Sequence, residues 1–316
     1  MDYARIYSKS SYLWEVIMKI TKGRANLMLL AVAILWGSSY VFAKEVVNSG
    51  MHSGLINGMR GLLGASAAAI VFNHSIRQTT KNDLKIGITL GLINFCGYYL
   101  QTMALQYTTP AKNAFLTTMY VVISPVIMWL VWHERLQRKD GIAIACAVIG
   151  MAILSGISPS HLSLQYGDFL TIISAIFWAL QIIFFARLGY KASSPWAIIF
   201  TISGTQGVCG WIAALINERT TFAHIDWWTA LPPLVAIAIV VTFMAQGLQL
   251  TAQHYTSPTA AGLILMLESF FGSALSVVLG FDPLTHRLII GGAIMILANV
   301  IMQIDLRHIP FLRSHN

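Results

Sequence analysis

Long apolar runs are the feature of this sequence that most constrains its fold. A helix of about 20 apolar residues is long enough to cross a lipid bilayer. Ten such runs lie at approximately 26–47, 53–72, 84–105, 110–132, 141–157, 168–186, 195–216, 230–250, 258–280 and 288–304. Hydrophobic residues make up 56% of the 316 residues and charged residues only 10%, so lipid must be part of the solvent. The sequence predicts an all-α polytopic membrane protein with ten transmembrane helices.

The basic residues predict the orientation of these helices. With the N-terminus assigned to the cytoplasm, fifteen of the 20 Lys and Arg residues fall on the cytoplasmic side. Lys44, Lys112, Arg219 and Arg287 fall on the opposite side, and Arg60 lies inside the second span. This bias fits the positive-inside rule and predicts a multi-pass protein of the cell (plasma) membrane with both termini cytoplasmic. Topology explains the net charge of +8, so no nucleic acid partner is expected.

Motifs for catalysis or metal binding are absent from the sequence. Cys96, Cys146 and Cys209 lie within apolar runs and lack the spacing of a metal site. HERLQ at His133 lacks the second histidine of a zinc-binding helix, and no glycine-rich loop is followed by Lys-Ser or Lys-Thr, as a nucleotide site requires. We therefore expect no metal, no cofactor and no use of ATP, in a chain that is not an enzyme.

Two interpretations of the N-terminal segment stay open. Residues 1–25 contain no secretory signal pattern, because no small-residue cleavage site follows a short apolar core. The stretch SYLWEVIMKITKGRA could form an interfacial amphipathic helix. Alternatively, translation starts at Met18, and the residues before it are a dispensable extension.

The chain contains an internal repeat. LQTMALQYTTPAKNA, from Leu100, aligns without gaps with LQLTAQHYTSPTAAG, from Leu248, at an offset of 148 residues. AILW, ending at Trp36, matches AIFW, ending at Trp178, at an offset of 142. Each half holds five spans, and this odd number makes the second half enter the membrane from the other side. The sequence thus predicts two inverted five-helix repeats around a central cavity.

The predicted domain organisation follows from this repeat. It comprises a cytoplasmic N-terminal segment (1–25), a first five-helix repeat (26–157), a linker (158–167), a second five-helix repeat (168–304) and a cytoplasmic tail (305–316). Inverted repeats suit secondary transport, because the two halves can exchange conformations around a site near the midplane.

Several motifs together resemble a known family. They are AILWGSSYVFAK in the first span, Arg60 in the second, YTTPAKNAFL with SP and HERL in the fourth, and YTSPTAAGLILMLES with GFDPL in the ninth. Over residues 26 to about 304, the chain resembles the EamA type of the drug/metabolite transporter superfamily. The resemblance implies a ten-helix transporter, and the family includes exporters of amino acids and other metabolites.

The sequence departs from this family pattern at two positions. Ser269 follows Glu268 where the family often has proline, and Asp282 stands where it often has glutamate. The first departure leaves open whether the ninth helix is broken there, whereas the second conserves charge.

Glu268 is the candidate on which most of the functional prediction rests. No other charged side chain lies between His254 and Asp282. A carboxyl group at mid-bilayer depth is costly when ionised, and it must face the bundle interior or water. We expect Glu268 to line the transport cavity as a substrate or proton site, and a buried structural hydrogen bond is the alternative.

Two tryptophans and two basic residues are further candidates. Trp36 and Trp178 lie near the middle of their spans, where they could close over a substrate, stack on a cationic one, or pack in the core. Arg60 could hold an anionic group, tie helix ends together by binding carbonyl groups, or pair directly with Glu268. Lys112, near the outer end of its span, is expected to be a solvated or locally paired charge, and a gating role is the alternative.

Neutral polar residues complete the predicted substrate site. Asn94, Tyr98 and Gln101 recur at spacings of four and three residues, which places them on one helical face. The eighth span contributes Gln246 and Gln249. Such residues should face a cavity or neighbouring helices. They suit a zwitterionic or neutral polar solute, although hydrogen bonds between helices would use them equally well.

The expected function is secondary transport of a small polar metabolite, an amino acid or a related compound, out of the cell by alternating access. Transport would be either uncoupled or coupled to protons through Glu268. The alternatives are efflux of cationic amphipathic compounds and, less well supported, a membrane-embedded enzyme acting on a lipid-linked substrate. The expected partners are a small-molecule substrate, the lipid bilayer and, for a coupled mechanism, protons, in a monomer or weak homodimer.

Overall fold

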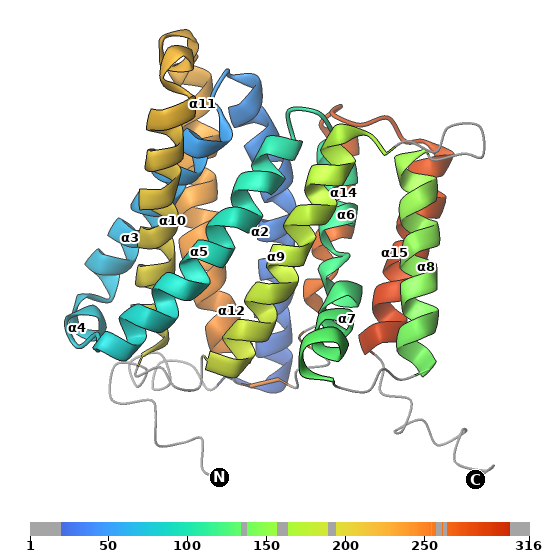
Figure 1. Ribbon diagram of the computed structural model, residues 1–316, viewed down its shortest axis with the longest axis horizontal. Helices are drawn as coiled ribbons and strands as arrows, with labels where there is room; N and C mark the ends of the chain where they lie inside the picture. Colours follow the sequence, from blue (N-terminus) through green and yellow to red (C-terminus); the bar gives the residue numbers. More distant parts are fainter. Residues whose placement is uncertain are drawn as a thin grey trace.

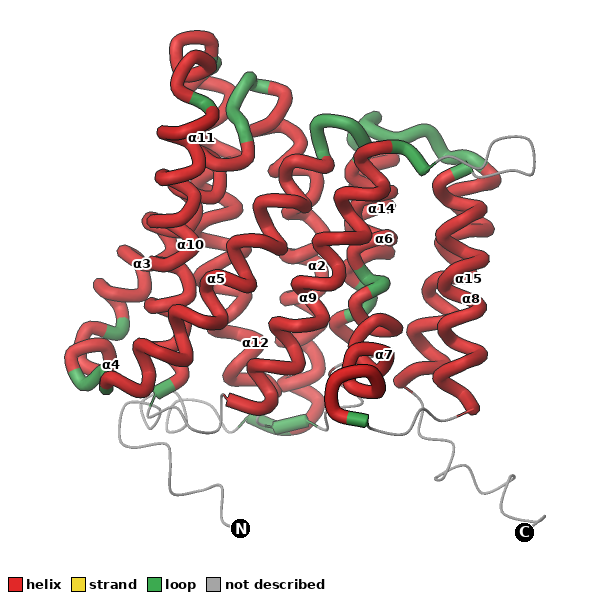
Figure 2. The backbone as a smooth tube through the Cα atoms, in the orientation of Figure 1, coloured by secondary structure: helices red, strands yellow, loops and turns green. Residues whose placement is uncertain are grey.

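The computed structural model describes residues 20–133, 138–156, 164–188, 194–253, 255–256, 261 and 264–303. All regular secondary structure in these ranges is helical, and the helices form one bundle (Figure 1 and Figure 2). Most of the predicted interfacial helix, and the predicted tail 305–316, lie outside the described residues.

The helices follow one another in two sets. The first set is α2 (Lys22–Asn48), α3 (Ser53–Val71), α4 (Asn73–Arg77), α5 (Lys81–Ala104), α6 (Pro110–Thr117), α7 (Tyr120–Trp132) and α8 (Arg138–Ser155). The second set is α9 (Tyr166–Leu188), α10 (Pro195–Asn217), the 3-10 helix η3 (Arg219–His224), α11 (Trp227–Val235), the π-helix η4 (Ala236–Met244), α12 (Ala245–Gln253), α14 (Glu268–Val278) and α15 (His286–Gln303). α11, η4 and α12 are continuous and make one long helical span.

Six helical stretches among the described residues are long and apolar enough to cross a membrane. They are Lys22–Asn48, Ser53–Val71, Pro110–Trp132, Tyr166–Phe185, Trp196–Asn217 and Trp227–Gln249. Two shorter apolar helices are Glu268–Val278 and His286–Ile301. The all-helical, multi-pass membrane class is therefore confirmed, whereas the count of ten spans stays a prediction. One predicted span, α8, opens with Arg138, Lys139 and Asp140, which lowers its apolar character.

Local sequence determines where several helices begin. The Thr80 hydroxyl accepts a hydrogen bond from the backbone N–H of Asp83 (3.1 Å), and the Asp83 carboxylate accepts one from the backbone N–H of Thr80 (2.8 Å). This capping box starts α5. Thr109 caps α6, whose first residue is Pro110, and Asp226 caps α11. These caps satisfy backbone donors that would otherwise lack partners at the helix ends.

Corresponding helices of the two sets make corresponding contacts. α3 packs against α10, and α8 packs against α15. The contact of α5 with α9 corresponds to the contact of α12 and η4 with α2. The contact of α6 with α9 likewise corresponds to the contact of α14 with α2. In Figure 1, α2 runs from the lower end of the view to the upper end, and α9 runs in the opposite direction. These are the contacts that a two-fold axis between the halves would produce.

Glycine residues allow α3 and α10 to approach closely. Both helices carry the pattern Gly-x-x-Gly-x-x-Gly, at Gly58, Gly61 and Gly64 and at Gly204, Gly207 and Gly210. A side chain added at Gly207 would lie 2.7 Å from the backbone nitrogen of Leu62 in α3. Since that distance is far below van der Waals separation, the packing requires glycine there. When the two patterns are aligned, Arg60 corresponds to Gln206.

One polar contact occurs twice, once in each half. The Thr108 hydroxyl donates to the Asp168 carboxylate (Oγ1 to Oδ1, 2.9 Å), and the Thr256 hydroxyl donates to the Asn26 side-chain oxygen (Oγ1 to Oδ1, 2.9 Å). Thr108 and Thr256 are 148 residues apart, and Asn26 and Asp168 are 142 apart, which are the two offsets of the repeat. Each contact joins the end of one half's third span to the start of the other half's first span.

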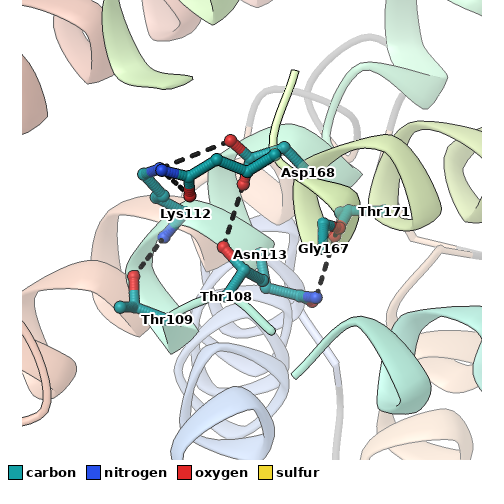
Figure 3. Close-up of polar contacts among 8 residues, drawn as sticks. Thr108, Thr109, Lys112, Asn113, Gly167, Asp168 and Thr171 are labelled. Carbon is teal, nitrogen blue, oxygen red and sulfur yellow. Dashed lines mark hydrogen bonds and ion pairs between the residues drawn. The ribbon is translucent and has the colours of Figure 1, made fainter. Parts of the chain in front are cut away.

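Lys112 lies beside the first of these contacts (Figure 3). Its ammonium nitrogen is 3.3 Å from the Asp168 carboxylate and donates to the Gln165 side-chain oxygen (3.1 Å). The next residue, Asn113, donates from its side chain to the Thr171 hydroxyl (3.1 Å). The Asp168 side chain is fully buried, and that of Lys112 is 20% exposed. Lys112 therefore forms a local pair where α6 meets α9.

Candidate functional site

Two helices are interrupted at the same position of the repeat. Thr118 and Met119 form a turn between α6 and α7, and Met266 and Leu267 form a turn before α14, 148 residues later. The backbone N–H of Met119 donates to the Leu116 carbonyl (3.2 Å), and that of Leu267 donates to the Ile264 carbonyl (3.1 Å). A second matching pair follows: Val121 donates to Thr118 (3.1 Å), and Ser269 donates to Met266 (3.4 Å). Both turns therefore use the tighter i to i+3 bonds of a 3-10 helix.

The interruption before α14 forms without a proline. The Ser269 hydroxyl donates to the Met266 carbonyl (3.1 Å), and the Ser273 hydroxyl donates to the Ser269 carbonyl (2.7 Å). At the other interruption, the Thr118 hydroxyl donates to the Phe115 carbonyl (2.7 Å). These hydroxyl groups bind carbonyl oxygens near the break, where backbone pairing is disturbed. The departure from the family pattern at Ser269 thus leaves the ninth span broken.

Tyr120 and Glu268 begin the helices that follow the two interruptions. They are 148 residues apart, and α7 starts at Tyr120 as α14 starts at Glu268. The two side chains interact electrostatically, and Tyr40 of α2 also interacts with Glu268. Glu268 is only 5% exposed and forms no ion pair with any described residue. A buried carboxyl group therefore lies at the N-terminal end of a half-helix, close to two phenol groups.

The backbone of α2 passes close to Glu268. A side chain added at Gly37 would lie 2.7 Å from the Glu268 carbonyl oxygen and 2.8 Å from the backbone nitrogen of Gly272. Tyr40 follows Gly37 by about one turn and is buried. The close approach at Gly37, where any larger residue would collide with α14, thus brings Tyr40 to Glu268.

Hydrogen bonds lead from Tyr40 to the third span. The side chains of Tyr40 and Thr117 are hydrogen-bonded to each other. Gln101 of α5 donates to the Thr117 hydroxyl (3.0 Å), and Thr117 donates to the Asn113 carbonyl (2.7 Å). Gln101 and Thr117 are both buried. The polar face of the third span is therefore turned into the protein at Gln101.

Arg60 of α3 contacts both η4 and α5. Its Nε donates to the Thr242 hydroxyl (2.6 Å), and its guanidinium carbon is 3.8 Å from the centroid of the Tyr98 ring, a cation–π contact. Thr242 belongs to the π-helix η4 and donates to the carbonyl of Ile237, five residues earlier (2.8 Å). We call Tyr40, Arg60, Tyr98, Gln101, Thr117, Tyr120, Thr242 and Glu268 the central polar cluster.

Arg60 and Glu268 do not pair directly. Neither side chain forms an ion pair with any residue in the described ranges. Tyr40 interacts electrostatically with both of them. A buried guanidinium group and a buried carboxyl group thus both lie within electrostatic range of one phenol, without a salt bridge between them.

A small pocket lies within the central polar cluster. Its lining residues are Ser39, Tyr40, Ala43, Arg60, Gln101, Thr102 and Leu105, which come from α2, α3 and the end of α5. It encloses about 10 Å³, which is room for about one water molecule. The pocket is therefore nearly closed in this conformation.

Comparison with known proteins identifies the family. The EamA-like transporter family matches the chain twice, over residues 23–156 and 165–303. The chain belongs to the EamA-like transporter family. The two matched ranges cover α2 to α8 and α9 to α15, so each set of helices corresponds to one copy of the family domain.

Relatives of this EamA-like transporter carry transporter names. An "Uncharacterized transporter" of Archaeoglobus fulgidus is 30% identical over 280 residues, which cover 89% of this chain and 86% of the relative. The "Probable amino-acid metabolite efflux pump" of Salmonella typhimurium is 25% identical over 292 residues, which cover 88% of this chain and 93% of the relative. A solved crystal structure superposes with a TM-score of 0.60 at 15% identity, over 88% of this chain and 96% of that chain, which shows a shared fold. These names agree with the expectation that the chain is not an enzyme.

Two further predicted residues lie beside the central polar cluster. Trp178 of α9 packs edge-on against Tyr98, with ring centroids 4.5 Å apart and an interplanar angle of 87°. Asn94 is buried and donates to the Gln181 side-chain oxygen (3.1 Å). Trp178 Nε1 and Asn94 Oδ1 are buried atoms without a hydrogen-bond partner in the described part of the chain. The predicted polar face of α5 therefore points toward α9.

Other predicted residues lie away from the pocket. Trp36 packs among apolar residues of two core clusters, which agrees with the core-packing interpretation. Gln246 and Gln249 are half-buried in α12 and do not line the pocket. Lys112 lies at the junction of α6 and α9. The structure thus brings together only part of the predicted substrate site.

Four residues of the central polar cluster carry no prediction from the sequence: Tyr40, Thr117, Tyr120 and Thr242. Two of them could be found by extending the repeat at the offset of 148, because Tyr120 corresponds to Glu268 and Thr242 corresponds to Asn94. Tyr40 lies four residues after Trp36, on the same face of α2. Thr117 has no comparable signal.

The described residues contain no group of three or more His, Cys, Asp or Glu side chains that could hold a metal ion. Cys96, Cys146 and Cys209 are free thiols of intermediate burial. The chemistry of the candidate site is therefore that of the central polar cluster.

Proposed function

We propose that this chain is a secondary transporter that exports a small polar metabolite, an amino acid or a related compound, across the plasma membrane by alternating access. Membership of the EamA-like transporter family supports transport, and the name of the Salmonella typhimurium relative supports the substrate class. The observation that carries the proposal is that Arg60 and Glu268 are both buried in the central polar cluster, and that neither forms an ion pair with a residue that the structure describes. Two such groups suit a solute that itself carries charged or strongly polar ends.

The repeat supports the alternating-access part of the proposal. Corresponding helices make corresponding contacts, as expected of two inverted halves. The matched interruptions at 118–119 and 266–267 supply hinges at the same position of each half. Since each span stops and restarts there, α7 and α14 can tilt relative to the preceding half-helix without moving a whole span.

We assign Glu268 the role of a coupling or substrate-binding group. A carboxyl group that is buried without a cationic partner is costly when ionised, so it binds either a proton or a cationic group of the substrate. Glu268 is the first residue of α14, where the helix dipole favours negative charge. In the first role Glu268 gains and loses a proton during the transport cycle, and in the second it stays ionised and pairs with the substrate.

Efflux of cationic amphipathic compounds is the second candidate function. The paired aromatic rings of Tyr98 and Trp178 favour it, together with the buried carboxyl group of Glu268. It has weaker support, because Arg60 already stacks on the Tyr98 ring, and a second cation in that position would be repelled.

Uptake into liposomes that contain the purified protein tests the proposal. Labelled amino acids and organic cations are compared at two pH values, with and without a proton gradient, for the parent protein, Glu268→Gln and Glu45→Gln. Glu45→Gln is a matched control, because it removes a half-buried carboxylate near the end of α2, outside the central polar cluster.

We expect the parent and the Glu45→Gln control to transport at least one amino acid. Proton coupling through Glu268 predicts that the solute accumulates only with the gradient, and that Glu268→Gln loses this dependence. If the parent and Glu268→Gln transport the solute equally, with or without the gradient, the protein is a facilitator and Glu268 has no coupling role. Transport of organic cations without any amino acid would favour the second candidate.

A further inference from the structure

Arg60 is a buried cation whose surroundings leave one of its nitrogens unused. It is 3% exposed, Nε donates to the Thr242 hydroxyl, and the guanidinium carbon lies over the Tyr98 ring, 3.8 Å from its centroid. The terminal nitrogen Nη2 is buried and has no hydrogen-bond partner among the described residues. An arginine buried with neither a counter-charge nor a full set of hydrogen bonds is costly, particularly at membrane depth. The residue is therefore positioned for a partner from outside the chain.

The pocket beside Arg60 has the chemistry of an anion site. Its other polar lining groups are hydroxyl and amide groups, on Ser39, Tyr40, Gln101 and Thr102, and Arg60 is the only charged lining residue. With about 10 Å³ of space, the closed pocket admits a group the size of one oxygen atom, not a whole solute. An arginine that lines such a pocket can donate to the oxygen of a carboxylate.

The position of Glu268 narrows the class of solute further. Tyr40 lines the pocket and interacts electrostatically with Glu268, which is not among the lining residues. A solute that holds its anionic end at Arg60 and a cationic group toward Tyr40 would meet a protein group of opposite sign at each end. A doubly charged anion would gain from Arg60 but would be repelled by an ionised Glu268.

We propose that Arg60 binds the carboxylate group of the transported solute, and that this solute is a zwitterion of the α-amino acid type. The inference rests on the proposed function, because it names the substrate group that the transport site recognises. Gln206, the repeat counterpart of Arg60, donates its side-chain amide to Asn57 instead (3.1 Å). One half therefore carries the carboxylate-binding group, and the other half carries a neutral amide at the same place.

The repeat also supplies the variant that tests this role. Arg60→Gln installs the residue that the other half tolerates at the corresponding position, and Arg60→Lys keeps the charge but loses the planar pair of donors. Arg187→Gln is the matched control, because the guanidinium carbon of Arg187 also stacks on an aromatic ring, 4.1 Å from the centroid of Trp132, away from the pocket.

Binding is measured on the purified, detergent-solubilised protein by ligand-induced shifts in thermal unfolding. The probes are L-threonine, L-leucine and L-phenylalanine, the carboxamides of the same amino acids, and inorganic phosphate. We expect at least one amino acid to stabilise the parent and its carboxamide to do so at least ten-fold more weakly in apparent affinity. Arg60→Gln should lose this preference for the acid, Arg60→Lys should retain part of it, and Arg187→Gln should bind as the parent does.

Several results would overturn the inference. They are equal binding of acid and carboxamide by the parent, no binding of any acid, unchanged acid preference in Arg60→Gln, or stabilisation by phosphate and not by amino acids. If Arg60→Gln does not fold, the comparison of acids with carboxamides on the parent still tests whether the carboxylate is recognised, and Arg60→Lys tests whether Arg60 recognises it. Binding is separable from transport, because Arg60-dependent binding of an acid that liposomes do not take up would support this site while rejecting the proposed function.

Discussion

Tyr120 and Glu268 occupy the same position in the two repeats, begin corresponding half-helices and interact with each other electrostatically. Arg60 and Gln206 are likewise counterparts in the glycine patterns of α3 and α10. Each buried charge of the central polar cluster therefore has a neutral counterpart in the other half. The backbone follows the repeat closely, whereas the two charged side chains depart from it.

Tyr120→Phe should weaken transport without unfolding the protein. The substitution removes only the hydroxyl, through which Tyr120 interacts electrostatically with Glu268, and keeps the aromatic packing, so thermal stability should change little. We expect the transport rate to fall by roughly ten-fold, the effect of about 1.4 kcal/mol in the barrier. Tyr166→Phe is the control, since Tyr166 is exposed at the start of α9. Liposome uptake that is equal for the parent and both variants would mean that the Tyr120 hydroxyl has no part in transport.

Alanine should have opposite effects at two glycines of α10. A methyl group at Gly207 would collide with the backbone of α3, whereas a methyl group at Gly204 would meet no atom within 4 Å. We expect Gly207→Ala to lower the free energy of unfolding by about 1–3 kcal/mol, as overpacking does. Gly204→Ala should be neutral or raise it by about 0.5–1 kcal/mol, because alanine favours helix. Thermal unfolding of the two variants in the same detergent measures the difference, and equal midpoints would contradict the close packing of α3 on α10.

Asp168→Asn should be milder than Asp168→Ala. The asparagine copies the repeat counterpart, Asn26, and can still accept the hydrogen bond from Thr108, although it loses the ion pair with Lys112. Alanine loses both contacts and leaves the Thr108 hydroxyl without a partner, so it should cost about 1–3 kcal/mol of stability. Chemical or thermal unfolding compares the variants. An equal loss in both variants would contradict this prediction, because the ion pair that both of them lose would then account for the whole effect.

Asp226 should make the start of α11 sensitive to acid. Hydrogen bonds from the Thr229 side chain and from the backbone N–H groups of Thr229 and Trp228 hold the pKa of Asp226 below its ordinary range. A lowered folded-state pKa stabilises the protein above the unfolded-state pKa of about 3.9, and this contribution is lost as the pH falls through the folded-state pKa. Asp226→Asn caps the helix without titrating. The parent should therefore lose its thermal stability relative to Asp226→Asn as the pH is lowered from about 5 to 3, and parallel pH profiles would contradict this role.

The sequence predicts the class of fold and the repeat because both depend on patterns along the chain. Apolar runs indicate membrane spans. The sequence offsets of 148 and 142 also relate matched hydrogen bonds in the structure, such as Thr108 to Asp168 and Thr256 to Asn26. The interruption before α14, at Met266 and Leu267, has no proline between Pro258 and Pro283. It depends on serine hydroxyls that bind backbone carbonyls, which a search for helix breakers does not detect.

The candidate site is only partly predictable because it depends on how each helix is rotated. The isolated positions of Glu268 and Arg60 in apolar sequence single them out, and their burial agrees with a special role. Which residues they meet follows from packing: Gly37 brings Tyr40 to Glu268, and η4 presents Thr242 to Arg60. Gln246 and Gln249 have suitable side chains, but the rotation of α12 leaves them outside the pocket.

Because Arg60 and Glu268 have neutral counterparts, this fold in one chain differs from a dimer of two identical halves. An antiparallel homodimer of a single five-helix half would contain every side chain twice, so it would bury two arginines or two glutamates related by the axis. Like charges would then repel each other in a low-dielectric interior, and each would add its own desolvation penalty. One gene that joins two diverged halves can instead place one basic and one acidic group in the same buried cluster, each present once. Fusion of the halves thus permits a site with two different ends, which a symmetric dimer could not build from a single sequence.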